Sequence, residues 1–141
     1  MIITKTREEI ALMREAALVV SKTLGMLAEE VKVGITTNKL NTLAEDFIRS
    51  QDAVPGFLGL YDCPSTLLTS VNEAVVHGLP TDIPLKEGDI VSIDCGAIKH
   101  GFYGDHAYTF EIGEVAPETK KLLQITKESL YIGIEQLISG N

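Results

Sequence analysis

The chain has 141 residues, 45% of them hydrophobic and 23% charged, a composition typical of one globular domain with a core of its own. Its 12 basic and 20 acidic residues give a net charge of −8, which argues against a surface that binds the phosphates of DNA or RNA. The first ten residues lack the apolar run of a signal peptide, no apolar run is long enough to span a membrane, and two cysteines are too few for a disulfide framework, so we expect a reduced cytoplasmic protein.

Two helices are predicted in the first third of the chain. Within residues 6–31, apolar residues recur at alternating steps of three and four, and Thr6 and Glu9 have the spacing of a capping box. Because the pattern is short, it favours packing on a sheet over a coiled-coil seam. The apolar stripe consists of Ile10, Met13, Ala17, Val20, Leu24, Leu27 and Val31. A second helix is predicted over residues 37–50, with its buried face formed by Leu40, Leu43, Ala44, Phe47 and Ile48.

The middle of the chain is predicted to be irregular at first and then to form strands. Residues 53–66 hold two prolines and two glycines, which predict a loop that keeps several apolar side chains. The segments LLTSVN (67–72) and AVVHG (74–78) have the composition of short strands, and residues 90–111 are typical of a β-hairpin. Strands joined by such short turns must be antiparallel neighbours.

The last predicted element is a helix that begins with Pro117 at its first position, runs to about residue 139 and is closed by Gly140. Its apolar side is formed by Leu123, Leu130, Ile134, Leu137 and Ile138. The predicted order is therefore α–α–β–β–β–β–α. This order indicates an α+β fold, with an antiparallel sheet covered by helices on one face.

The predicted hairpin carries an aspartate on each arm, Asp94 and Asp105. If Lys99 and His100 form its tip, positions that sum to 199 face one another, and the two carboxylates lie directly opposite. Like charges in that arrangement destabilise a sheet, so we expect a divalent cation to offset the repulsion. Oxygen ligands favour a hard or borderline ion such as Mn²⁺, Co²⁺ or Fe²⁺. The alternative is that both aspartates lie at loop ends and face water.

The histidines and cysteines allow fewer predictions. His77 follows a predicted strand and could bind a substrate or move a proton near neutral pH, although a histidine in a turn is more often simply solvated. His106 should point to the sheet face opposite the aspartates, and His100 should be exposed at the hairpin tip. Cys63 and Cys95 are most simply small buried hydrophobic residues.

Taken together, these segments resemble the first half of a type I methionine aminopeptidase over essentially all 141 residues. SVNEAVVHGLP (70–80) is similar to the SxNExVxHGxP segment of that family, and IDCGAIKHGFYGDHAYTF (93–110) resembles its IDxGxxxxGxxxDxxxTF segment. The resemblance implies the pita-bread (creatinase/aminopeptidase) fold. Residues 1–141 would form a single truncated domain, the N-terminal half of a metalloaminopeptidase catalytic domain.

The resemblance also implies roles for individual residues. Asp94 would be a bidentate ligand of one metal ion, and Asp105 would bridge both ions of a dinuclear site. His77 would contact the substrate near the scissile amide and support the tetrahedral intermediate, while Cys63 and Leu68 would line the methionine pocket. The implied reaction is removal of the initiator methionine from nascent polypeptides with two divalent ions (Co, Mn, Fe or Zn), in the cytoplasm and in association with the ribosome.

The sequence departs from the family pattern at the methionine pocket. The family commonly has an aromatic residue where this chain has Cys63. Phe57, Leu60 and Leu68 could therefore repack that pocket.

The family's remaining ligands, one histidine and two glutamates, lie in its second half and are not among these 141 residues. We therefore expect the chain by itself to bind metal weakly, to hydrolyse nothing and to self-associate through exposed apolar surface. The alternative function is a non-catalytic module on the same fold that binds peptides or proteins. The presence of Asp94, Asp105 and His77 together favours the enzyme.

Overall fold

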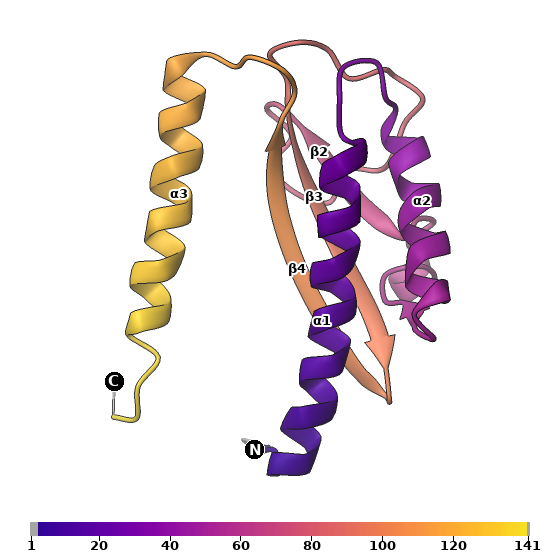
Figure 1. Cartoon of the computed structure of the whole chain (residues 1–141), viewed down its shortest axis with the longest axis vertical. Coiled ribbons are helices and arrows are strands. Elements are labelled where there is room, and N and C mark those ends of the chain that lie inside the picture. Colours follow the sequence, from indigo (N-terminus) through magenta and orange to yellow (C-terminus); the bar gives the residue numbers. More distant parts are fainter. Residues whose placement is uncertain (1–2, 141) are drawn as a thin grey trace.

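One antiparallel sheet of four strands, with β3 at its centre, organises the computed structural model, which describes residues 3–140 (Figure 1). β3 (Ile90–Lys99) pairs along its whole length with β4 (Phe102–Glu111). Its other edge is shared by β2 (Leu67–Val71) and β1 (Val54–Pro55). The sheet confirms the predicted α+β class and the hairpin over residues 90–111.

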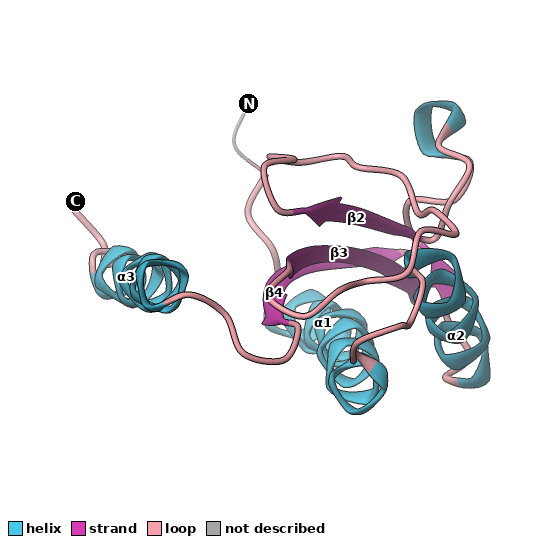
Figure 2. Cartoon of the chain, turned by 90° about the horizontal axis from the view of Figure 1, so that it is seen from above, coloured by secondary structure: helices cyan, strands magenta, loops and turns pink. Residues whose placement is uncertain are grey.

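Two helices, α1 (Arg7–Glu30) and α2 (Thr37–Ser50), cover one face of this sheet (Figure 2). α1 packs on β3 and β4, and α2 packs beside α1 and against β1 and β2. Both predicted helices are confirmed. The capping box of α1 is also present, because Glu9 N donates to Thr6 Oγ1 (3.1 Å) and Thr6 N donates to Glu9 Oε2 (2.7 Å).

The buried stripe of α1 differs from the predicted one in its first turns. Ile10 is 48% exposed, because the start of α1 reaches past the hairpin tip, where His100 contacts Glu15. Ala17 of the predicted stripe is also exposed, and Ala16 is buried in its place. Further along, Val20, Leu24 and Leu27 agree with the prediction, and the buried residues of α1 are Ala16, Val19, Val20, Thr23, Leu24 and Leu27. A Cβ at Gly104 of β4 would lie 2.5 Å from the carbonyl oxygen of Ala16, so glycine at this position permits the close approach of helix to strand.

The core lies between the two helices and the sheet face that they cover. α2 contributes three of its five predicted buried residues in fully buried form, and the alternating residues of β3 complete the layer. Members of this core with no exposed surface include Val20, Leu27, Leu40, Ala44, Ile48, Leu67, Val91, Ile93 and Cys95. Burial of this apolar surface is the main force that holds the helices on the sheet.

The predicted strand at residues 74–78 is wrong, because this segment is irregular. Asn72 and His77 have φ values of 53° and 59°, left-handed conformations that a strand does not contain. The fourth strand is instead β1, which lies inside the predicted loop over residues 53–66. The 3₁₀ helix η1 (Leu60–Asp62) lies in the same stretch.

The third helix, α3 (Pro117–Glu135), is confirmed but ends before the predicted residue 139. It lies apart from the sheet, and none of its residues is buried in the described chain (Figures 1 and 2). It contacts the rest of the chain through an ion pair between Lys120 and Glu114 (2.9 Å) and through the approach of Lys127 Nζ to the Tyr108 ring (5.8 Å from the centroid). Within residues 3–140, no helix is both long enough and apolar enough to cross a membrane.

Candidate metal and substrate site

The tip of the hairpin is His100–Gly101, one residue later than predicted. Both residues have positive φ, 54° and 77°, as a two-residue type I′ turn requires. Lys99 therefore pairs with Phe102, and paired positions sum to 201 instead of the predicted 199. The prediction missed this because the signal for the turn is the glycine in its second position, which permits the left-handed backbone.

The corrected register makes Asp94 and Asp105 diagonal neighbours, not directly opposed residues. Asp94 faces Ala107, and Asp105 faces Gly96. The observed register moves each residue of one arm by two positions along the other arm. Side chains alternate between faces with a period of two, so both aspartates still share one face of the hairpin. That face is opposite Val91, Ile93 and the rest of the core and is the one that α1 and α2 leave open (Figure 2). The Cα atoms of diagonal neighbours in an antiparallel pair lie about 7–8 Å apart, and their side chains can come closer than that.

The electrostatics of this face centre on Asp94. Its Oδ1 atom is buried and has no hydrogen-bond partner among the described residues. Burial raises the pKa of Asp94 above its ordinary 3.8, and the negative charge of Asp105 raises it further, whereas His77 acts in the opposite direction. The structure therefore brings Asp94, Asp105 and His77 into one electrostatic cluster.

These residues fit a divalent cation. A cation would give the orphaned oxygen of Asp94 a partner and would offset the repulsion from Asp105. The described residues hold no group of three or more His, Cys, Asp and Glu side chains arranged around one metal position. Within residues 3–140, the two aspartates thus form part of a coordination shell and not a complete one.

His77 is held in place by its neighbour Gly78. Thr69 N on β2 donates to Gly78 O (2.7 Å), and Gly78 N donates to Ser70 Oγ (3.2 Å). A Cβ at Gly78 would lie 2.3 Å from the Thr69 carbonyl oxygen, so the contact is possible only for glycine. Sequence reasoning missed Ser70, although the alternation along β2 could have placed it on the open face beside Leu68.

The candidate pocket residues Phe57, Cys63 and Leu68 are all half-buried. Leu68 faces Asp94 across the β2–β3 pair and is half-buried. The Phe57 ring lies over Gly96, where an added Cβ would come within 2.6 Å of it. Cys63 is half-buried and donates from Sγ to the Ser65 carbonyl oxygen (3.5 Å), so the prediction that it is a buried hydrophobic residue holds only in part.

The other histidines and the second cysteine lie outside this cluster. His106 pairs with Cys95 and so lies on the opposite face from Asp105, as predicted. His100 is exposed at the tip and contacts Glu15 at 2.7 Å. Cys95 is buried and free, and burial raises the pKa of its thiol to about 12, which keeps it neutral and unreactive.

Comparisons with known proteins agree with this geometry. Residues 11–141 match the model of metallopeptidase family M24. The chain is 49% identical to a methionine aminopeptidase of Clostridium acetobutylicum over 142 residues, covering 100% of this chain and 57% of that protein. It is 44% identical to methionine aminopeptidase 1 of Bacillus subtilis, covering 99% of this chain and 56% of that protein.

The fold gives the same result. The crystal structure of methionine aminopeptidase from Thermotoga maritima superposes with a TM-score of 0.94 at 37% identity, covering 97% of this chain and 55% of that one. The chain thus spans a little more than half the length of the relatives that it matches. By sequence and by fold, this chain belongs to metallopeptidase family M24 and has the architecture of the N-terminal part of the pita-bread fold.

Proposed function

We propose that this chain contributes two carboxylate ligands and a substrate-binding histidine to a methionine aminopeptidase, which removes the initiator methionine from new polypeptides with two divalent ions. The observation that carries the proposal is the buried, unpartnered Oδ1 of Asp94 beside the charge of Asp105. Divalent ions at such a site, here Co, Mn, Fe or Zn, polarise the carbonyl that is attacked. The relatives are named methionine aminopeptidases, which supports a polypeptide with an N-terminal methionine as the substrate.

Each residue has a distinct part in this proposal. Asp94 and Asp105, from neighbouring strands, would hold the divalent ions through their carboxylates, and the ions would supply the Lewis acidity that polarises the carbonyl. His77, fixed by the hydrogen bonds of Gly78, contacts the substrate near the scissile amide and stabilises the charge that develops there. Leu68 and Cys63 provide the apolar surroundings of the methionine side chain.

The proposal places the protein in the cytoplasm near the ribosome, where new polypeptides emerge. Both cysteines are free, which is compatible with a reducing compartment. Neither DNA nor a membrane is part of the proposal, since the net charge is −8 and the described helices are not membrane spans.

We further propose that the 141-residue chain by itself binds metal weakly, does not hydrolyse peptides and self-associates. Two carboxylates are too few for a complete coordination shell. On α3, large apolar side chains such as Leu122, Leu130 and Ile132 are each about 60% exposed, which a monomer tolerates poorly. Light scattering at high micromolar concentration is expected to show oligomers, and a well-behaved monomer would contradict the self-association.

A chimaera tests the main proposal. The part of the C. acetobutylicum relative that matches this chain is replaced by the chain, and release of methionine from Met-Ala-Ser is measured with Mn²⁺ or Co²⁺. We expect activity in the chimaera and a loss of at least 1,000-fold in its Asp94→Asn and Asp105→Asn variants, because each removes a ligand. Asp46→Asn, which changes an exposed aspartate of α2, is the matched control and should keep full activity. A folded, metal-loaded chimaera without activity, or an active Asp94→Asn variant with unchanged metal content, would contradict the proposal.

A further inference from the structure

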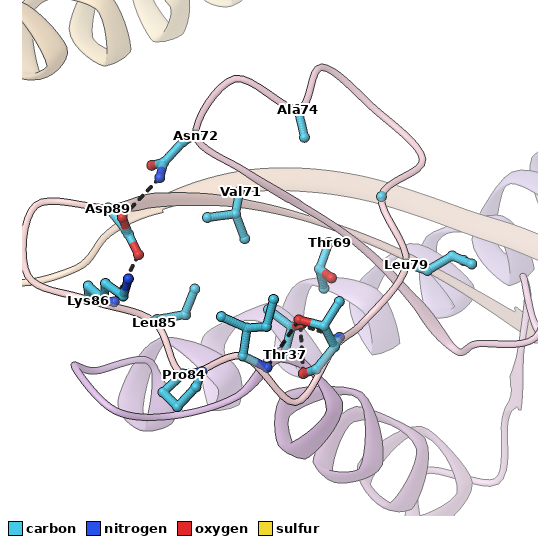
Figure 3. Close-up of a pocket in the computed structure, with 13 residues that line it drawn as sticks. Thr37, Thr69, Val71, Asn72, Ala74, Leu79, Pro84, Leu85, Lys86 and Asp89 are labelled. Atoms are coloured by element: carbon cyan, nitrogen blue, oxygen red, sulfur yellow. Dashed lines mark hydrogen bonds between the residues drawn. The ribbon is translucent and has the colours of Figure 1, made fainter.

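A cleft lies on the other side of β2 from the two aspartates. It has a volume of about 380 Å³ and lies between the N-terminal end of α2, residues 83–86 and an arch formed by residues 72–79 (Figure 3). Thr69 and Val71 of β2 line its inner wall and alternate with Leu68 and Ser70, which face the open side. The cleft is therefore separate from the candidate metal site.

The cleft contains one buried polar group without a partner. Thr69 is 4% exposed, and its Oγ1 atom makes no hydrogen bond with any described residue. Figure 3 shows its side chain directed into the space between the arch and α2. A buried hydroxyl without a hydrogen-bond partner is unfavourable, so a ligand group that hydrogen-bonds to it in the cleft gains a favourable contact.

The remaining walls are mainly apolar. Hydrocarbon surface from three different segments is contributed by Val71, Leu79, Ile83, Pro84 and Leu85. A volume near 380 Å³ is within the range of small-molecule sites, which are typically apolar with a few placed polar groups. Both size and lining thus fit a compact apolar ligand.

The charges around the cleft argue against an ionic ligand. Two backbone amides in the first turn of α2 already have hydrogen-bond acceptors, because Lys39 N donates to Thr36 Oγ1 (3.2 Å) and Asn38 N donates to Thr81 O (3.0 Å). At the mouth, both carboxylate oxygens of Asp89 accept hydrogen bonds, and the positive charge of Lys86 partly offsets the charge of this carboxylate. Neither an anion nor a cation finds an unopposed partner there.

We propose that this cleft is a binding site for a small, uncharged, mainly apolar molecule with one hydroxyl or carbonyl group that hydrogen-bonds to Thr69. The proposal is independent of the proposed function, because it concerns a different face of β2 and needs no metal or peptide substrate.

The experiment titrates the isotope-labelled 141-residue chain with benzyl alcohol and follows its amide resonances by NMR. Toluene, which lacks the hydroxyl, and benzoate, which is charged, are the matched probes. We expect benzyl alcohol to shift the amides of Val71, Leu79 and Ile83 and to bind about three- to tenfold more tightly than toluene, as one net hydrogen bond predicts. Benzoate should bind more weakly than both.

Four variants separate the hydroxyl from the cavity. Thr69→Val should remove the preference for benzyl alcohol over toluene, whereas Thr69→Ser should keep it. Ala74→Phe, which fills the cleft from the exposed arch, should weaken both ligands at least fivefold. Val76→Phe is its control, because Val76 is in the same arch but does not line the cleft.

The proposal is overturned if 10 mM benzyl alcohol leaves the amides of the cleft unshifted. Shifts centred on the exposed apolar residues of α3, or an equal preference for benzyl alcohol in wild type and Thr69→Val, would overturn it as well. The Thr69→Ser result keeps the test valid if the valine variant does not fold.

Discussion

The two faces of the β3–β4 hairpin are built from alternating residues of the same strands, yet their chemistry differs. On the covered face, Val91, Ile93 and Cys95 have no exposed surface and pack against α1 and α2. On the open face, Ser92 bonds to Thr109 (2.8 Å), while Asp94 has a buried oxygen without a partner. The covered face is satisfied by the described chain itself, and the open face is not.

The difference between the faces shows how a buried polar atom without a hydrogen-bond partner can indicate a binding site. A face that serves only stability would place apolar or paired polar residues at positions 94 and 105. A carboxylate whose pKa is raised by burial and by a second carboxylate reduces stability unless a ligand compensates. The carboxylates of the open face therefore reduce the stability of the fold, and a bound cation would offset this loss.

The largest expected effect sharpens the contrast between the faces. Ile93→Ala should lower the free energy of unfolding by about 2–5 kcal/mol, because it opens a cavity in the core. Ser92→Ala, one residue away on the open face, should cost only about 1 kcal/mol for the lost hydrogen bond to Thr109. Urea denaturation of both variants measures the difference, and equal losses would contradict the division into two faces.

The next effect concerns the attachment of the His77 segment to β2. Gly78→Ala should lower the free energy of unfolding by about 1–3 kcal/mol, since its Cβ displaces the Thr69 carbonyl and breaks two hydrogen bonds. Gly25→Ala is the control in an open position of α1 and should raise it by about 0.5–1 kcal/mol. If both alanines acted alike, close packing would not be what holds Gly78 on β2.

A smaller effect tests the unsatisfied carboxylate directly. Without metal, Asp94→Asn should raise the free energy of unfolding at pH 7 by less than about 1 kcal/mol after solvent screening. The pKa of Asp94 is raised in the folded state, so the stability that its neutral form retains below pH 3.8 is lost as the pH rises through the folded pKa. The advantage of the variant should therefore disappear below pH 3.8. An Asp94→Asn variant that is less stable at pH 7 in EDTA would contradict this account.

The smallest effect concerns Asp89, whose pKa is shifted in the opposite direction to that of Asp94. Hydrogen bonds from Asn72 and from the Lys86 amide lower the pKa of Asp89 below 3.8. Its contribution to stability is complete above pH 3.8 and is lost as the pH falls through the lowered value. Asp89→Asn should thus cost less than about 1 kcal/mol at pH 7 and reduce the sensitivity to acid. Denaturation curves at pH 2–7 should show opposite trends for the Asp89 and Asp94 variants, and parallel trends would contradict the assignment.

The sequence predicted the parts of the fold that depend on local periodicity and caps. The capping box at Thr6 and the hairpin arms follow from side-chain spacing and are confirmed, and the predicted face of α2 is confirmed in three of its five residues. The strand predicted at 74–78 is wrong because composition does not reveal the left-handed backbone at His77, which the tertiary hydrogen bonds of Gly78 support. The short β1 has no periodicity of its own and forms only through pairing with β3.

The sequence predicted that Asp94 and Asp105 share one face of the hairpin, but it placed the turn one residue too early. The face shared by Asp94 and Asp105 depends only on the parity of the hairpin pairing, so it survives an error of one residue at the tip. The alternation along β2 indicates the face on which Ser70 lies, but not its hydrogen bond with the irregular segment at Gly78, which depends on tertiary packing. The apolar spacing of α3 likewise predicts a helix, but it does not show that none of its residues is buried against the described chain.

The central claim is that Asp94 and Asp105 together hold divalent cations on the open face of the hairpin. Paramagnetic broadening of the amide resonances of the labelled chain by substoichiometric Mn²⁺ tests it most directly. The account predicts that the amides around Asp94, Asp105 and Gly96 broaden first, and that Asp94→Asn, but not Asp46→Asn, abolishes this selectivity. Broadening spread evenly over the acidic surface, or unchanged by Asp94→Asn, would contradict it.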